Sequence, residues 1–225
     1  KPKTDYHVED VQCWSLEQAQ TFLELIKTPL PIQYKDRQRK SNTGAYYEVK
    51  GYTEYKPLDF QFIVMFEILI FCGLRRGELI ALEWKDFSYK DRILDINKST
   101  AFLNNRMIDK STKGHRSRKV PLPQFLADDI LKLKKQQKEY MLSIGDKWSG
   151  KRNDQQKIFI QQDGKQMYLS TPYNKFKSVI KMCNTAIQDP DKKLPEITLH
   201  SLRHTNATLL ISENTDVRTV SSLLG

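Results

Sequence analysis

The sequence predicts a mainly α-helical domain that carries a small antiparallel β-sheet. Apolar residues recur with helical spacing in several segments, whereas residues 93–122 change to short β-like runs separated by turn residues. The 225 residues suffice for a sizeable core, as one large domain or two small ones. We expect residues 1–12 to be the remnant of a linker and residues 13–225 to form one domain.

The N-terminal half predicts three helices. The first is expected at 15–27, because Ser15 and Gln18 form a capping-box pattern. Asp59 as a cap and Gly73 as a stop bracket an apolar helix at 60–72, and a short helix at 76–82 follows.

Residues 29–57 are polar, basic and rich in tyrosine. We expect a long loop or insertion here, with at most a little strand. Its composition would suit contact with DNA, and a packed insertion fits equally well.

The C-terminal half predicts the sheet and the remaining helices. Strands are expected within 93–122, with turns at Asn104–Asn105 and at Gly114. A long helix is expected at 123–143 and a brief hairpin around 158–164. Further helices should begin near Pro172, after Thr198 and after Thr215, the last one at 216–224.

Charge and cysteine content narrow the class of partner and the compartment. Lys and Arg number 37 against 27 Asp and Glu, a net charge of +10, which favours a polyanion such as nucleic acid. An ordinary basic soluble protein is the alternative, and no apolar run approaches the roughly 18 residues of a membrane span.

The three cysteines include no Cys-x-x-Cys pair, which argues against a disulfide framework or a cysteine zinc site and fits a reducing cytoplasm.

The segment Thr198–His204 carries the most informative spacing. His200 and Arg203 are three residues apart and therefore share a helix face, a pairing suited to a phosphodiester. His200 and His204 also have the i, i+4 spacing of zinc-binding helices. Ser201, however, stands where the metalloprotease pattern requires Glu, so we expect no metal. The phosphate-loop spacing at 145–151 is interpreted as accidental, because Arg152 replaces the required Ser or Thr.

Two more segments offer basic groups. Arg75 lies between two predicted helices, and Glu78 is close enough to hold its guanidinium; the alternative is a surface Arg-Arg pair at a helix start. Residues 98–119 contain seven Lys or Arg and one Asp, which suits either DNA contact or a solvated ribbon. The candidate DNA contacts are Lys98, Arg116, Arg118 and Lys119.

These parts combine into one chemistry. Arg75 and Arg203 could clamp a phosphate, His200 could exchange a proton, and Lys113 could protonate the leaving oxygen. No paired carboxylates suggest two metal ions. Metal-independent phosphoryl transfer of this kind usually needs a covalent nucleophile from the protein.

Three ordered segments resemble the catalytic domain of tyrosine recombinases, in particular phage or mobile-element integrases. They begin at Cys72-Gly-Leu-Arg75, at Thr112-Lys113-Gly114 and at Thr198-Leu-His200. The resemblance implies site-specific DNA strand exchange through a 3′-phosphotyrosyl intermediate. It gives phosphate binding to Arg75 and Arg203, general-acid catalysis to Lys113, proton transfer to His200, and supporting roles to Glu78 and His204. It also implies no cofactor, tetramers on paired DNA sites, and the cytoplasm of a bacterial host.

Two departures qualify the resemblance. Cys72 replaces the commoner Thr, a change that we expect to be tolerated. The family continues past Leu-Leu-Gly225 to its nucleophilic tyrosine, so we expect this fragment to bind DNA without cleaving it. The alternatives are a non-catalytic DNA-binding regulator with the same fold, a type IB topoisomerase, and a metal hydrolase built on His200 and His204.

Overall fold

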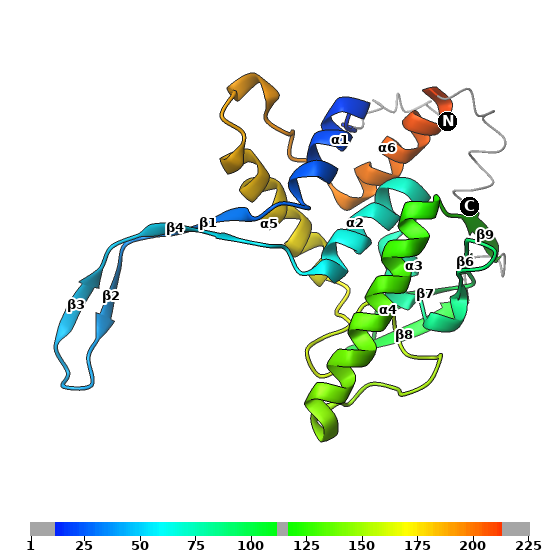
Figure 1. Cartoon of the computed structure of the whole chain (residues 1–225), viewed down its shortest axis with the longest axis horizontal. Helices are drawn as coiled ribbons and strands as arrows, with labels where there is room; N and C mark the ends of the chain where they lie inside the picture. Colours follow the sequence, from blue (N-terminus) through cyan, green and yellow to red (C-terminus); the bar gives the residue numbers. More distant parts are fainter. Residues whose placement is uncertain (1–11, 112–116, 213–225) are drawn as a thin grey trace, which may run out of the picture.

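The structure is a computed structural model, and it describes residues 12–111 and 117–212. The described chain is mainly helical with small antiparallel sheets, as the sequence predicts (Figure 1). Its α-helices are α1 Leu16–Leu25, α2 Phe60–Cys72, α3 Arg76–Ala81, α4 Gln124–Ile144, α5 Thr171–Ala186 and α6 Leu199–Ser212. Short 3₁₀ turns occur at η1 Trp84–Asp86, η2 Gly145–Lys147 and η3 Pro190–Lys192. Within these residues, no helix is both long and apolar enough to cross a bilayer.

Helix α2 forms the centre of the core and packs against α4, α5 and α6. Its ends match the predicted signals. The Asp59 carboxylate accepts a hydrogen bond from the backbone N–H of Gln61, and Gly73 ends the helix at φ 59°. Cys72 is buried, and burial raises the pKa of its thiol to about 12, so it is a core residue.

The predicted sheet at 93–122 is confirmed and divides into two parts. Strands β5 Phe87–Ser88, β6 Ile93–Ile96 and β9 Arg118–Pro121 form an antiparallel sheet. Strands β7 Lys98–Leu103 and β8 Arg106–Ser111 form a separate hairpin. Its turn is at Asn104–Asn105, as predicted, with φ of 48° and 60°, which Asn tolerates better than most residues. The turn predicted at Gly114 lies outside the described residues.

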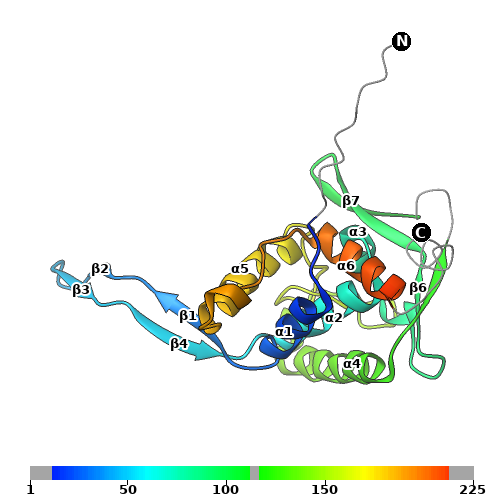
Figure 2. The same ribbon diagram turned by 90° about the horizontal axis from the view of Figure 1, so that it is seen from above.

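Residues 30–56 form a long β-ribbon where the sequence analysis expects a loop with at most a little strand. Strand β1 Leu30–Tyr34 pairs with β4 Tyr52–Lys56, and β2 Arg37–Lys40 pairs with β3 Tyr46–Val49. The ribbon extends well away from the helices (Figures 1 and 2). The pairing was not visible in the sequence because β2 and β3 have no apolar face to reveal a period of two.

The other predicted elements follow the sequence with small shifts. The capping box at Ser15 is present, although α1 ends at Leu25 and not at residue 27. A bridge between Ile160 and Gln166 confirms the brief hairpin. The helix expected at 216–224 lies outside the described residues.

Candidate functional site

Arg75 and Glu78 form the first half of the site, at the start of α3. Arg75 is the N-cap residue, with an extended backbone, and its N–H donates to Glu78 Oε2 at 3.0 Å. Its guanidinium Nη1 donates to Glu78 Oε1, also at 3.0 Å. The Glu78 side chain is 3% exposed and that of Arg75 is 49% exposed. Glu78 therefore holds the Arg75 guanidinium in place from the protein interior, while part of the guanidinium faces solvent.

Arg118, at the start of β9, holds the same carboxylate from the other side. Its Nη1 and Nη2 donate to Glu78 Oε1 and Oε2 at 3.1 and 2.7 Å, a bidentate pair. Burial alone would raise the pKa of Glu78, but the hydrogen bonds from Arg118 and Arg75 hold that pKa below its usual value. Glu78 is thus an ionised, buried anchor that is shared by two arginines far apart in sequence.

Helix α6 brings the second half of the site to the end of α2. The Thr198 hydroxyl accepts from the N–H of Ser201 at 3.1 Å and so caps the helix start, as predicted. Asn206 Nδ2 donates to the carbonyl of Ile70 at 2.8 Å, and Arg203 Nη1 donates to the carbonyl of Gly73 at 3.0 Å. Because α3 begins shortly after Gly73, these contacts place Arg203 beside Arg75.

The electrostatics of the site show how close these cations are. Burial, together with the nearby charges of Arg75 and Arg118, lowers the pKa of Arg203 to about 10. The pKa of His200 is also lowered, first by burial and then by His204, Arg203 and Arg75. Arg203 is therefore protonated at neutral pH, while the His200 imidazole is neutral and can accept or donate a proton.

A pocket of about 290 Å³ opens beside these groups. It is lined by Arg75 and His200 together with Leu74, Arg76, Tyr173, Thr198 and Leu199. The imidazoles of His200 and His204 meet edge to face, with ring centroids 4.9 Å apart. The pocket has two cationic groups and one neutral imidazole on its wall, an arrangement that can hold an anion and pass a proton to it.

The structure brings together most of the predicted site residues. Arg75, Glu78, His200, Arg203 and His204 lie at one place, although they come from segments more than 120 positions apart. Lys113 and Arg116 lie outside the described residues. The catalytic and supporting roles of all these side chains stay predictions.

The predicted DNA contacts fall into different environments. Lys119 is exposed on β9. Lys98 is 17% exposed and pairs with Glu83 at 2.6 Å, and the Arg118 side chain is 12% exposed on Glu78. Each of these two cations is held by a buried carboxylate, and the DNA contacts of all three residues stay predictions.

Sequence reasoning missed two features of the site. Arg118 is predicted from the sequence as a DNA contact, and no local pattern indicates that its guanidinium faces Glu78. Tyr173, at the start of α5, also lines the pocket, and no pattern in the sequence indicates this position. Across the described part of the chain, no group of three or more His, Cys, Asp or Glu is arranged to hold a metal ion.

Comparison with known proteins places this geometry in a family. Residues 47–225 match the model of the phage integrase family. The ICEBs1 integrase of Bacillus subtilis (strain 168) is 30% identical over 186 residues, which cover 79% of this chain and 45% of that protein. A tyrosine recombinase of Pseudothermotoga lettingae is 29% identical over 178 residues, covering 79% of this chain and 50% of the relative. The chain thus spans about half the length of these relatives.

Solved structures share the fold. The integrase of the transposon Tn1549, solved in complex with transposon right-end DNA, superposes with a TM-score of 0.67 at 18% identity, covering 98% of this chain and 60% of that one. XerA recombinase superposes with a TM-score of 0.59 at 19% identity, covering 95% and 56% of the two chains. At such identities the likeness shows the fold, while the family match covers most of the sequence. The chain belongs to the phage integrase family, that is, to the tyrosine recombinases.

Proposed function

We propose that this chain is the catalytic domain of a site-specific recombinase that cleaves and rejoins DNA through a 3′-phosphotyrosyl intermediate. The proposal rests on one observation above all. Arg75 and Arg203, which are 128 positions apart in sequence, are close enough for their charges to interact, and a neutral His200 lines one pocket together with Arg75. Family membership and the DNA-bound Tn1549 integrase support DNA as the partner.

Each residue would have a distinct role. Arg75 and Arg203 would bind the non-bridging oxygens of the scissile phosphate, because guanidinium groups match phosphate geometry with paired hydrogen bonds. Glu78 would keep Arg75 in place. His200, neutral near pH 7, would accept the proton of the attacking hydroxyl or donate to a phosphate oxygen. Lys113 would protonate the 5′-oxygen as it leaves.

The oligomer and the DNA contacts complete the proposal. Tetramers on paired DNA sites would allow two duplexes to exchange strands. The exposed Lys119 would contact the DNA backbone. Arg116 would do the same.

Covalent capture tests this function. The protein is translated from its complete natural reading frame and incubated with a random-sequence library of nicked duplexes. In these duplexes the strand released by cleavage is too short to stay annealed, so the covalent intermediate accumulates whatever the preferred site. A protein–DNA adduct is expected, and peptide mass spectrometry should locate it on a tyrosine joined to a 3′-phosphate.

Matched variants connect the adduct to the site. Arg75→Gln and Arg203→Lys should slow adduct formation about 10²- to 10³-fold, the usual effect of removing one group that stabilises a transition-state oxyanion. Lys147→Gln should change nothing, because Lys147 is exposed in η2, the short turn that follows the C-terminal end of α4. Duplex binding without any adduct would refute strand cleavage and favour a DNA-binding regulator. Absence of duplex binding would refute both functions.

A further inference from the structure

The tip of the β7–β8 hairpin exposes apolar side chains on both of its faces. Phe102 is 61% exposed, Leu103 39% and Ile108 41%. Successive residues of a strand point to opposite faces, so Phe102 and Leu103 lie on different sides of the ribbon. Phe102 pairs with Met107 across the ladder, which extends the apolar surface on its side. A two-stranded ribbon in water gains nothing from apolar side chains on both faces, so this tip fits a partner that surrounds it.

The end of the tip is polar and cationic. Asn104 and Asn105 form the turn with positive φ, and Arg106 follows them; all three are exposed. The tip therefore combines an apolar pair immediately behind the turn with amide and guanidinium donors at the turn itself. Proteins that enter the minor groove of DNA combine the same two classes of side chain.

The root of the hairpin is held rigidly on α3. A Cβ atom at Gly77 would collide with Ser99 Oγ and would lie 2.7 Å from the carbonyl oxygen of Thr100, so the strand lies directly on the helix backbone. Across the ladder, Thr100 Oγ1 donates to Asp109 Oδ1 at 2.6 Å. These contacts fix the hairpin two residues behind Phe102.

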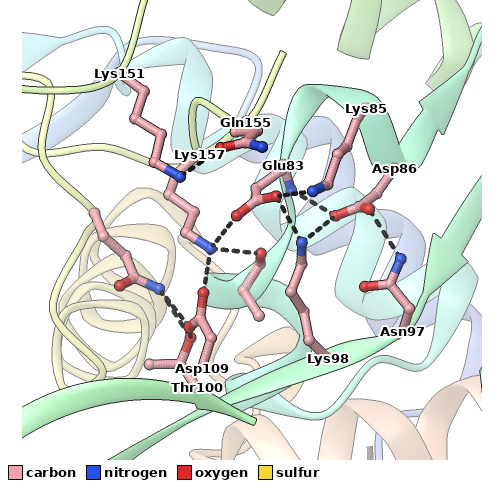
Figure 3. Close-up of polar contacts among 12 residues, drawn as sticks. Glu83, Lys85, Asp86, Asn97, Lys98, Thr100, Asp109, Lys151, Gln155 and Lys157 are labelled. Carbon is pink, nitrogen blue, oxygen red and sulfur yellow. Dashed lines mark hydrogen bonds and ion pairs between the residues drawn. The ribbon is translucent and has the colours of Figure 1, made fainter. Parts of the chain in front are cut away.

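An ionic network centred on the buried Glu83 reinforces the root (Figure 3). Lys157 Nζ donates to the Ala81 carbonyl at 3.0 Å, to Glu83 Oε1 at 2.9 Å and to Asp109 Oδ2 at 2.5 Å. Lys98, at the start of β7, pairs with the same Glu83 carboxylate. Burial alone would raise the pKa of Glu83, but hydrogen bonds from Lys98, Lys157 and Lys85 lower it to about 2, so the Glu83 carboxylate stays ionised across the physiological range. A tip fixed in this way loses little conformational entropy on binding.

The hairpin is also in the right place for DNA. It projects beyond the helices on the side where α6 begins, the end of α6 that carries His200 (Figure 2). Its root rests on α3, whose N-cap residue is Arg75. From the Thr100–Asp109 pair to Leu103 the strand rises about 10 Å, the height of about three stacked base pairs. The tip therefore reaches about three base pairs beyond a root that rests on the helix beginning at Arg75.

We propose that the β7–β8 tip is a wedge that enters the DNA minor groove and inserts Phe102 at a base step close to the bound phosphate. Leu103 packs against the groove wall, and Asn104, Asn105 and Arg106 donate to acceptors on the groove floor. This proposal rests on the proposed function, since it takes DNA as the partner. It adds a contact that distorts the duplex next to the phosphate site.

A single tryptophan reports directly on the insertion. The three native tryptophans, Trp14, Trp84 and Trp148, are only 1%, 5% and 6% exposed, so they are shielded from bases and quenchers. A Phe102→Trp variant adds one exposed indole. Titration with a 30-bp duplex of mixed sequence should quench the added fluorescence by stacking and protect it from iodide, while the wild-type emission stays constant.

Affinity measurements separate the wedge from general charge attraction. Phe102→Ala should weaken duplex binding about 5- to 100-fold, as loss of one aromatic–base contact does, with the same salt dependence as wild type. Arg106→Gln should instead reduce the salt slope by about one. Leu142→Ala is the matched control: Leu142 is 74% exposed near the C-terminal end of α4 and should have no effect. Phe102→Tyr keeps the ring and should bind like wild type.

The outcomes distinguish this proposal from the proposed function. If Arg75→Gln weakens duplex binding but Phe102→Ala does not and the indole is unquenched, the wedge is overturned and the phosphate site stands. If Phe102→Ala changes only self-association in sedimentation, the tip contacts another copy of the chain and the wedge is likewise overturned. If the wild type binds no duplex, the proposed function fails and the wedge fails with it. Circular dichroism should show every variant folded, because each altered side chain is exposed.

Discussion

Glu78→Gln is the substitution that most directly tests how the candidate site is built. Glutamine has the size of glutamate, so the change leaves the packing of α3 intact and removes only the negative charge and one acceptor oxygen. The carboxylate accepts one backbone and three guanidinium hydrogen bonds, from Arg75 and Arg118, while it is 3% exposed. In the variant, the amide NH₂ would face guanidinium N–H groups that also need an acceptor.

The expected magnitude follows from burial. Breaking a buried ion pair by removing one partner costs about 3–5 kcal/mol, because the remaining charge is left uncompensated. The Arg118 side chain is 12% exposed and cannot readily turn to water, whereas Arg75 is half exposed and can. Since only Arg118 is fully affected, we expect a loss at the lower end of this range. The free energy of unfolding should fall by about 3 kcal/mol. That is a large part of the about 5–15 kcal/mol available to a domain.

The effect should depend on pH in a defined direction. The folded-state pKa of Glu78 lies below its usual value of 4.5, because the two arginines stabilise the ionised form. A carboxyl group with a lowered pKa contributes stability that is fully present above its unfolded-state pKa and is lost as the pH falls through the folded-state value. The difference between wild type and Glu78→Gln should therefore be constant from about pH 6 to 8 and shrink below about pH 4.5.

Urea denaturation followed by circular dichroism measures this difference. Glu54→Gln is the control, because Glu54 pairs with Lys56 on the exposed ribbon, and its loss should not change the unfolding free energy measurably. A Glu78→Gln effect below about 1 kcal/mol at pH 7 would refute the argument that Glu78 is the buried anchor of the two arginines. So would an effect that is unchanged at pH 4.

Two further predictions concern neighbouring parts of the site. Gly77→Ala should destabilise the chain by about 1–3 kcal/mol through overpacking against Ser99 and Thr100, measured by urea denaturation; a neutral effect would show that β7 can move off α3. Binding of a duplex should raise the pKa of His200, because a phosphate offsets the cationic neighbours that lower it, and NMR titration of the imidazole protons should follow the rise. A His200 pKa that stays unchanged in the complex would place the phosphate elsewhere.

The sequence predicted the features that depend on local chemistry. The caps at Ser15, Asp59, Gly73 and Thr198 all lie where the residue types indicate, because capping is decided by a few neighbouring residues. The Asn104–Asn105 turn is predicted for the same reason, since few other residues tolerate positive φ.

Features that depend on distant contacts were not predictable in this way. The ribbon of β2 and β3 is solvated on both sides, so its pairing leaves no hydrophobic period. Arg118 lies in a basic run, so the sequence predicts a cation on the surface. Only the fold shows that its guanidinium faces Glu78. The grouping of Arg75 with Arg203 was inferred from the chemistry that a phosphate site requires and from the family resemblance, and no periodicity could supply it.

The charge balance of the site indicates what Arg118, whose side chain is 12% exposed, contributes to it. Arg75, Arg118 and Arg203 lie around the single negative charge of Glu78, and Arg76 lines the same pocket, so positive charge is in excess, while His200 is neutral near pH 7. A DNA phosphodiester carries one negative charge. Attack by a phenolate would bring a second one to phosphorus before the 5′-oxygen departs. Under the proposed function, an excess of more than one positive charge suits the doubly negative transition state better than the singly negative substrate, which is the condition for accelerating the chemical step and not only binding. Arg118 can therefore contribute to catalysis without contacting DNA. Its positive charge offsets the negative charge of Glu78, so the charges of Arg75 and Arg203 remain available for the phosphate.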